Sequence, residues 1–159
     1  MIAASVITIA FEACARGQLG FRELLAKLAR LGVDRYQADL VRCENVCYVA
    51  NGSFVVPAPL VRAPPAPTLS PIGIEVATRA LFRRRIGYDE FRERAAVAGC
   101  TSYQISIAGN RAAFFGRLGE SCSEPLAIQK RPPSTTPALV GVVTGTIVAA
   151  CSPSVGRSK

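Results

Sequence analysis

The chain has 159 residues, of which 50% are hydrophobic and 19% are charged, a composition that suits a globular domain with a core of ordinary size. No apolar run reaches the roughly 18 to 20 residues that a membrane-spanning helix needs, so we expect no membrane association. The net charge of +8 divides into +2 for residues 1–66, +2 for residues 67–125 and +4 for residues 126–159. Because residues 1–125 are only mildly basic and their one dense cluster, Arg83–Arg85, fits a helix C-terminus, we exclude specific nucleic-acid binding.

An internal repeat is the strongest signal in the sequence. Residues 10–52 align without a gap with residues 77–119, and ten of the 43 pairs are identical. Unrelated sequences of ordinary composition would share roughly three. We therefore predict a tandem duplication. Its parts are repeat 1 at 1–57, a proline-rich linker at 58–71, repeat 2 at 72–126 and a tail at 127–159.

Repeat 1 is predicted to contain two helices followed by three strands. Apolar residues recur at helical spacing over residues 3–16, and a second helix over residues 21–31 is bounded by glycines. The apolar period then changes to two, which predicts strands. These strands are expected at residues 36–41, 46–50 and 54–56.

The linker and repeat 2 follow the same plan. Six prolines in the fifteen residues Pro57–Pro71 predict a stiff, extended connection. Helices are expected at residues 72–84 and 88–98 and strands at residues 103–107 and 112–115, with a third strand left open. The predicted fold class is α+β, a pseudo-twofold duplication of an αα-βββ unit with helices packed on an antiparallel sheet.

The tail is expected to be a poorly ordered, basic appendage. It contains four basic residues and no acidic residue, and it has neither a helical nor a strand period. Truncation after Leu126 is expected to leave the thermal midpoint nearly unchanged and to lower the net charge from +8 to +4.

Three motifs recur in the two repeats: Gly20–Leu25, Leu31–Leu40 and Asn51-Gly52 in the first, with Tyr88–Phe91, Ala98–Tyr103 and Phe115–Glu120 in the second. They resemble the YbcV-like domain family of unknown function, whose members are sometimes labelled phage envelope protein. The resemblance covers residues 1–126 and implies an α+β fold, but no activity, cofactor or catalytic residue. Where members often carry histidine, this chain has Gln37 and Cys122.

The residue types present limit the chemistry. The chain has no histidine, which removes the commonest general base and the commonest zinc ligand. Its six cysteines are irregularly spaced, and Cys43 and Cys47 lack the spacing of a zinc knuckle, so we predict reduced structural thiols and no metal. A nucleophile at Cys122 would lie between Glu120 and Glu124, whose charges disfavour a thiolate. We expect no catalytic residue and no cofactor.

Three pairs of equivalent residues are the candidates for a ligand site. Glu23 and Glu90 would form an acid/base couple if the pseudo-twofold axis brought them together, whereas their place in the first turn of a helix favours a capping role. Either Tyr36 with Tyr103, or Gln37 with Gln104, would line a groove if the first strands of the repeats were neighbours. The alternative for the tyrosines is a place in the core with a satisfied hydroxyl.

The function expected from these observations is binding. We expect a cytoplasmic, non-enzymatic domain, monomeric or homodimeric, that holds a protein or small-molecule ligand in the groove between the repeats. Two alternatives stay open. One is an enzyme that uses carboxylate or tyrosine chemistry in the same groove, and the other is a phage-related accessory or structural protein.

Overall fold

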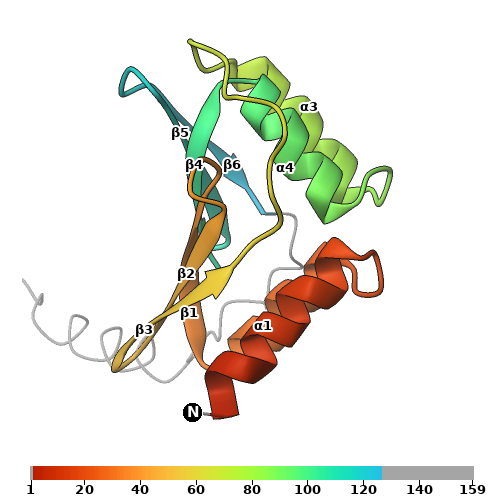
Figure 1. Cartoon of the computed structure of the whole chain (residues 1–159), viewed down its shortest axis with the longest axis vertical. Coiled ribbons are helices and arrows are strands. Elements are labelled where there is room, and N and C mark those ends of the chain that lie inside the picture. The colour runs from red at the N-terminus through yellow and green to blue at the C-terminus, as the bar shows by residue number, and fades with distance from the viewer. Residues whose placement is uncertain (1, 127–159) are drawn as a thin grey trace, which may run out of the picture. The chain divides into compact units, whose positions relative to one another are not determined.

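Two helices and three antiparallel strands follow one another twice along the chain (Figure 1). The structure is a computed structural model that describes residues 2–126, so the expectations about the tail lie outside the described residues. The predicted α+β class and the αα-βββ duplication are confirmed. The elements are α1 (Ile2–Ala15), α2 (Phe21–Arg30), β1 (Val33–Asp39), β2 (Glu44–Val49), β3 (Gly52–Pro57), α3 (Pro71–Phe82), α4 (Tyr88–Val97), β4 (Cys100–Ser106), β5 (Arg111–Gly116) and β6 (Ser121–Pro125).

The two repeats share details of backbone conformation as well as sequence. Within residues 2–126, every residue with a positive φ has a counterpart 67 positions away that also has a positive φ. The ends of α2 and α4 are one example, because Gly32 (φ 80°), which follows α2, corresponds to Gly99 (φ 89°), which follows α4. The turn after the first strand of each repeat is another example, because Cys43 (φ 55°) corresponds to Asn110 (φ 51°). The duplication therefore extends to the conformation of individual turns.

The six strands form one sheet in the order β3-β2-β1-β4-β5-β6. The two repeats join where β1 pairs with β4 in antiparallel fashion, and Gln37 lies directly opposite Gln104. These residues are exactly one repeat apart, so the pseudo-twofold axis passes between them. The duplication thus builds one continuous sheet from two equivalent halves.

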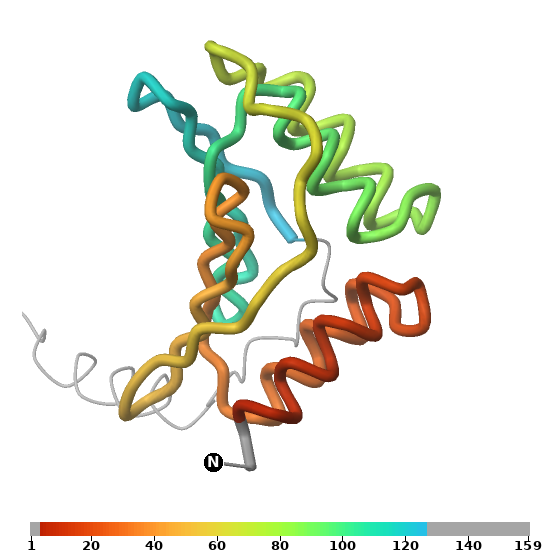
Figure 2. Tube along the Cα trace, viewed as in Figure 1, coloured from red at the N-terminus to blue at the C-terminus, as the bar shows by residue number. Residues whose placement is uncertain are grey.

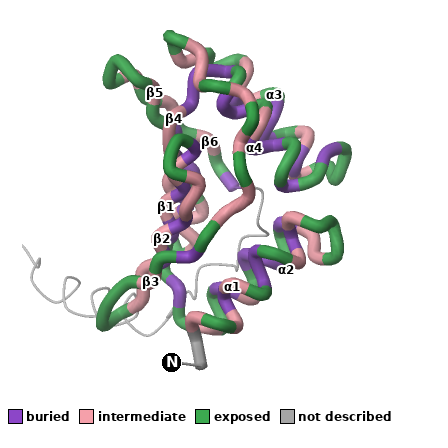
Figure 3. The backbone as a smooth tube through the Cα atoms, viewed as in Figure 1, coloured by how far each residue is buried: buried purple, intermediate pink, exposed green. Residues whose placement is uncertain are grey.

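All four helices lie on one face of this sheet (Figure 1). In each repeat they pack on that repeat's own strands: α1 contacts β3, α2 contacts β1, α4 contacts β4 and α3 contacts β6. The buried residues lie between the helices and the sheet, as Figure 3 shows. In the part of the chain that the structure describes, no helix covers the other face, and no helix is long and apolar enough to span a membrane.

Both first strands begin three residues earlier than predicted, because each contains a bulge near its start. The register shifts between Val33 and Arg35 in β1 and at the equivalent place, between Cys100 and Ser102, in β4. A bulge breaks the alternation of inward and outward side chains. The period of two is therefore visible in the sequence only from Tyr36 and Tyr103 onwards.

The linker is fixed against repeat 2 rather than hanging between the repeats. It runs from the end of β3 past α4 to the start of α3 (Figure 2). The Glu93 carboxylate on α4 accepts the backbone N–H groups of Arg62 (2.7 Å) and Ala63 (3.0 Å). Farther along, the Ser70 N–H donates to the Ala98 carbonyl at 2.7 Å. The linker is therefore part of the folded unit, and its side chains line the surface of α4.

Candidate functional site

Tyr36 and Tyr103 lie in the core, on the face of the sheet that the helices cover. Their hydroxyl groups do not meet directly; Tyr88, the first residue of α4, lies between them at 3.2 Å from Tyr36 and 2.7 Å from Tyr103. Burial raises the pKa of all three phenols, most strongly for Tyr36 and Tyr103. The tyrosines are therefore neutral core residues with satisfied hydroxyls.

Gln37 and Gln104 lie on the opposite, uncovered face of the sheet. Successive side chains of a strand point to opposite faces, so each glutamine faces away from the tyrosine next to it. The two glutamines are half-buried neighbours on the pseudo-twofold axis. No single groove can contain both the glutamines and the tyrosines.

Glu23 and Glu90 have different partners, although they occupy equivalent positions. The Glu23 carboxylate accepts the Gly20 N–H at 2.8 Å and pairs with Arg84 at 3.3 Å. The Glu90 carboxylate instead pairs with Arg94, one turn further along α4, at 2.6 Å. Glu23 therefore caps its helix, as its position indicated, and Glu90 forms an ion pair along the helix surface.

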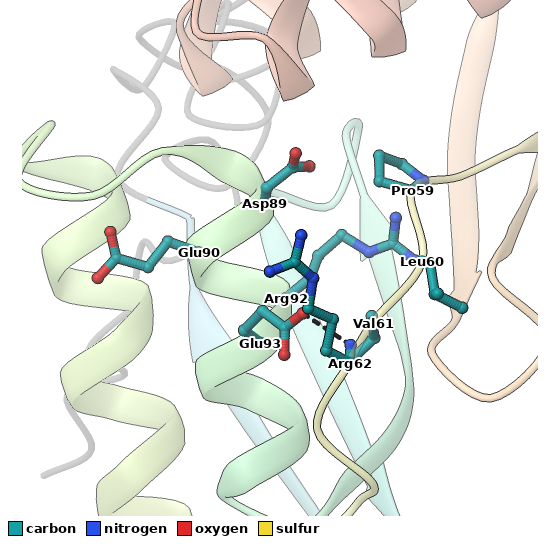
Figure 4. Close-up of a pocket in the computed structure, with 8 residues that line it drawn as sticks. All are labelled: Pro59, Leu60, Val61, Arg62, Asp89, Glu90, Arg92 and Glu93. Carbon is teal, nitrogen blue, oxygen red and sulfur yellow. Dashed lines mark hydrogen bonds between the residues drawn. The ribbon is translucent and has the colours of Figure 1, made fainter.

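A groove between the repeats is formed by two adjoining hollows, the linker hollow and the helix hollow. The linker hollow, of about 340 Å³, lies between the linker and α4 (Figure 4). The helix hollow, of about 300 Å³, lies between α1 and the start of the linker. They share Pro59 and Asp89. The linker hollow is lined by Pro59, Leu60, Val61, Arg62, Asp89, Glu90, Arg92 and Glu93, and the helix hollow by Phe11, Glu12, Ala15, Arg16, Pro57, Ala58, Pro59 and Asp89.

Arg92 is the unusual residue of this groove. It lines the linker hollow, yet only 1% of it is exposed, and none of its three guanidinium nitrogens has a hydrogen-bond partner within residues 2–126. Its counterpart in repeat 1 is Leu25, which is also buried. Arg92 was not among the site residues predicted from the sequence, although the alignment of the repeats contains a signal for it: an arginine is aligned with a leucine on the apolar face of a helix.

The carboxylates around Arg92 differ in their electrostatic environment. Asp89 reaches solvent at the rim, but desolvation raises its pKa; Arg92 opposes this increase and Glu93 adds to it. The two linker N–H groups that Glu93 accepts hold the pKa of Glu93 below its ordinary value of 4.5. Glu93 is thus occupied with the linker, whereas Asp89 has no ion-pair partner among residues 2–126.

The stability of the protein is expected to fall in acid partly because of Glu93. A carboxylate whose pKa is lower in the folded state stabilises the fold above its unfolded pKa, and this contribution disappears as the pH falls through the folded pKa. Urea denaturation at pH 6 and at pH 3 is expected to show a smaller loss of stability in Glu93→Gln than in the parent protein. Equal losses in the two proteins would contradict the role of Glu93.

The buried cysteines are expected to be chemically inert. Burial raises the pKa of Cys14, Cys47 and Cys100 to about 12, and only the thiolate is nucleophilic. Native protein treated with iodoacetamide at pH 8 should keep these three thiols unmodified by mass spectrometry, and urea should make them reactive. The half-buried Cys43 is the internal reference. Rapid alkylation of Cys14, Cys47 or Cys100 in native protein would contradict this prediction.

The described part of the chain offers no ready metal site. Within residues 2–126, no three side chains of histidine, cysteine, aspartate or glutamate come together in a way that could hold a metal ion.

The fold and the groove define a duplicated α+β domain with a ligand-sized groove at the junction of its repeats. The chain belongs to the DUF1398 family, proteins of unknown function, whose model matches residues 9–122. No curated protein matches the chain.

Proposed function

We propose that the chain is a non-enzymatic binding domain for a small ligand with an anionic group, held in the groove between the repeats. The observation that carries the proposal is Arg92, which lines the groove and whose buried guanidinium has no hydrogen-bond partner in the described part of the chain. Arginine is permanently charged, so it cannot avoid the cost of burial by losing its proton.

An anion in the linker hollow would supply what Arg92 lacks. An unpaired buried charge costs several kcal/mol, and one suitably placed anion offsets much of that cost. The planar guanidinium also matches carboxylate and phosphate groups with two parallel hydrogen bonds. A folded protein that keeps this charge unpaired has a site prepared for such a group.

The size of the groove favours a small molecule over a protein partner. The hollows of about 340 and 300 Å³ adjoin and lie in the range typical of small-molecule sites. Leu60 and Val61 offer apolar contact area beside the charged groups. A ligand of this size would touch both repeats, because α1 belongs to repeat 1 and α4 to repeat 2.

Binding is favoured over catalysis by the state of the reactive side chains. Burial holds the Cys14 thiol and the three core tyrosines in their neutral forms, which are poor nucleophiles and poor bases.

One observation favours the enzyme alternative. The raised pKa of Asp89 at the groove is a property that general acids and bases also have. Turnover of a bound ligand that is lost in Asp89→Asn would establish the enzyme instead.

The cytoplasm is the proposed location, and the free thiols of the described cysteines support it, since oxidising compartments convert many such thiols to disulfides.

The phage-related alternative would need a large apolar surface for assembly. Two exposed apolar residues on the uncovered face of the sheet, Val55 and Phe115, belong to β3 and β5, which three strands separate. On that face of the sheet, this separation favours ligand binding over assembly.

The test measures anion binding by the full chain and by two variants. Acetate, citrate and inorganic phosphate are titrated while the thermal midpoint is recorded. At least one of them is expected to raise the midpoint of the parent protein, because a ligand at a hundred times its Kd stabilises the folded state by about 2.7 kcal/mol. Arg92→Leu is expected to abolish the increase. Arg111→Leu removes an equal charge from an exposed position on β5 and should preserve it.

Two results would overturn the proposal. One is a parent protein whose midpoint responds to none of the three anions. The other is an Arg92→Leu variant that responds as the parent protein does.

A further inference from the structure

Two opposite charges, each without an ion-pair partner within residues 2–126, lie on α4 in the groove, and the exposed Arg62 of the linker is a third charge without one. Arg92 and Asp89 both line the linker hollow, and neither forms an ion pair within residues 2–126. The other two acidic residues there are occupied: Glu90 pairs with Arg94, and Glu93 accepts linker N–H groups.

The backbone positions of Asp89 and Arg92 are fixed by α4. Residues three apart on a helix are neighbours, with their Cβ atoms about 5–6 Å apart. A molecule whose positive and negative groups lie on adjacent carbon atoms can therefore reach both side chains. A simple anion would satisfy Arg92 but would bring its charge close to the Asp89 carboxylate.

Apolar surface lies on both sides of the charged residues in the groove. Asp89 lines both hollows, so it stands at their junction. On one side lie Leu60 and Val61 of the linker, and on the other lie Phe11 and Ala15 of α1. A ligand held at the junction by its charged end could extend an aliphatic group into either hollow.

We propose that the ligand is a zwitterion of the α-amino-acid class with an apolar side chain. Its carboxylate pairs with Arg92 and its ammonium group pairs with Asp89. This inference rests on the proposed function and narrows it, because it adds a positive group to the anionic ligand. The repeat 1 counterpart of this pair is Arg22 and Leu25, which offers no such combination of charges.

The experiment compares three probes that share one aliphatic group. They are leucine, 4-methylpentanoate, which lacks the amine, and isopentylamine, which lacks the carboxylate. Isothermal titration calorimetry with the full chain is expected to show leucine binding at least about tenfold more tightly than either analogue. That factor corresponds to the contribution of one additional charge contact.

Two variants assign the contacts. In Asp89→Asn, leucine is expected to lose its advantage, so that leucine and 4-methylpentanoate bind equally. In Arg92→Leu, binding of both carboxylates is expected to be lost. Asp34→Asn removes an exposed carboxylate at the start of β1, outside the groove, and should leave all affinities unchanged.

The outcomes separate the two proposals. If 4-methylpentanoate binds the parent protein as tightly as leucine and loses binding in Arg92→Leu, the zwitterion is overturned and the anion site stands. If Arg92→Leu binds both carboxylates like the parent protein, both proposals are overturned. If neither carboxylate binds the parent protein, the zwitterion is overturned, and the response of the thermal midpoint to acetate, citrate and phosphate decides the anion site. A leucine preference that persists in Asp89→Asn also overturns the zwitterion, because the ammonium group would then have another partner.

Discussion

Replacement of Gly99 with alanine is expected to lower the free energy of unfolding by more than about 4 kcal/mol, a loss that is exceptional for a single substitution. A Cβ atom at this position would overlap the backbone carbonyl of Thr68 and lie 2.9 Å from the Cα atom of Leu69. Both obstacles are backbone atoms at the end of the linker, which the Ser70 N–H ties to the Ala98 carbonyl. Neither the linker nor the end of α4 can move away without breaking this hydrogen bond. Equilibrium denaturation in urea measures the loss.

The equivalent substitution in repeat 1 is the matched control. Gly32 has nearly the same backbone conformation, with φ 80° against 89° for Gly99, but nothing lies within 4 Å of a Cβ atom built there. Gly32→Ala should therefore show only the cost of a left-handed conformation, about 1–2 kcal/mol. Equal losses in the two variants would show that linker packing contributes nothing at Gly99.

Arg92→Leu is expected to raise the free energy of unfolding by about 1–4 kcal/mol in the absence of ligand, the range found when buried charged groups are replaced with well-packed apolar residues. The substitution removes a guanidinium that has no partner and installs the residue that repeat 1 has at the equivalent position. Leucine is smaller than arginine, and any cavity that it leaves reduces the gain. The measurement is urea denaturation of the parent and variant proteins at pH 7.

The reciprocal substitution, Leu25→Arg, is the control for Arg92→Leu. It should destabilise the protein by about 3–5 kcal/mol, because it adds an uncompensated charge to a buried site. A loss of stability in Arg92→Leu would contradict our account of Arg92. It would mean that the guanidinium stabilises the unliganded fold.

Much of the fold was predictable from local signals. A glycine stands at each end of the second helix of both repeats, where the backbone needs a cap or a positive φ. Such glycines can be recognised in the sequence alone. The starts of β1 and β4 were not predictable, because a bulge hides the first inward-facing residue, Val33 in β1, from any search for alternation. The third strand of repeat 2 was left open because its sequence, Ser121–Pro125, has few apolar residues to alternate.

The candidate site was less accessible to sequence reasoning. The predicted site residues are identical in the two repeats, whereas Arg92 is unusual because it differs from its counterpart, Leu25. Its burial depends on the linker crossing α4 at Pro59–Arg62, a tertiary contact without a local sequence signal. Tyr36 and Tyr103 were prominent in the alignment because both build the core on the pseudo-twofold axis.

The pairing of β1 with β4 has a consequence for how such a site could evolve. Two identical single repeats joined by the same pairing would form a symmetric dimer, and every substitution would then occur twice. An arginine at the position of Leu25 and Arg92 would bury two unpaired charges, one in each half. Fusion of two copies in one gene removes this constraint, because one half can conserve the core while the other half diverges. The covalent duplication is thus what allows an asymmetric groove in a nearly symmetric molecule.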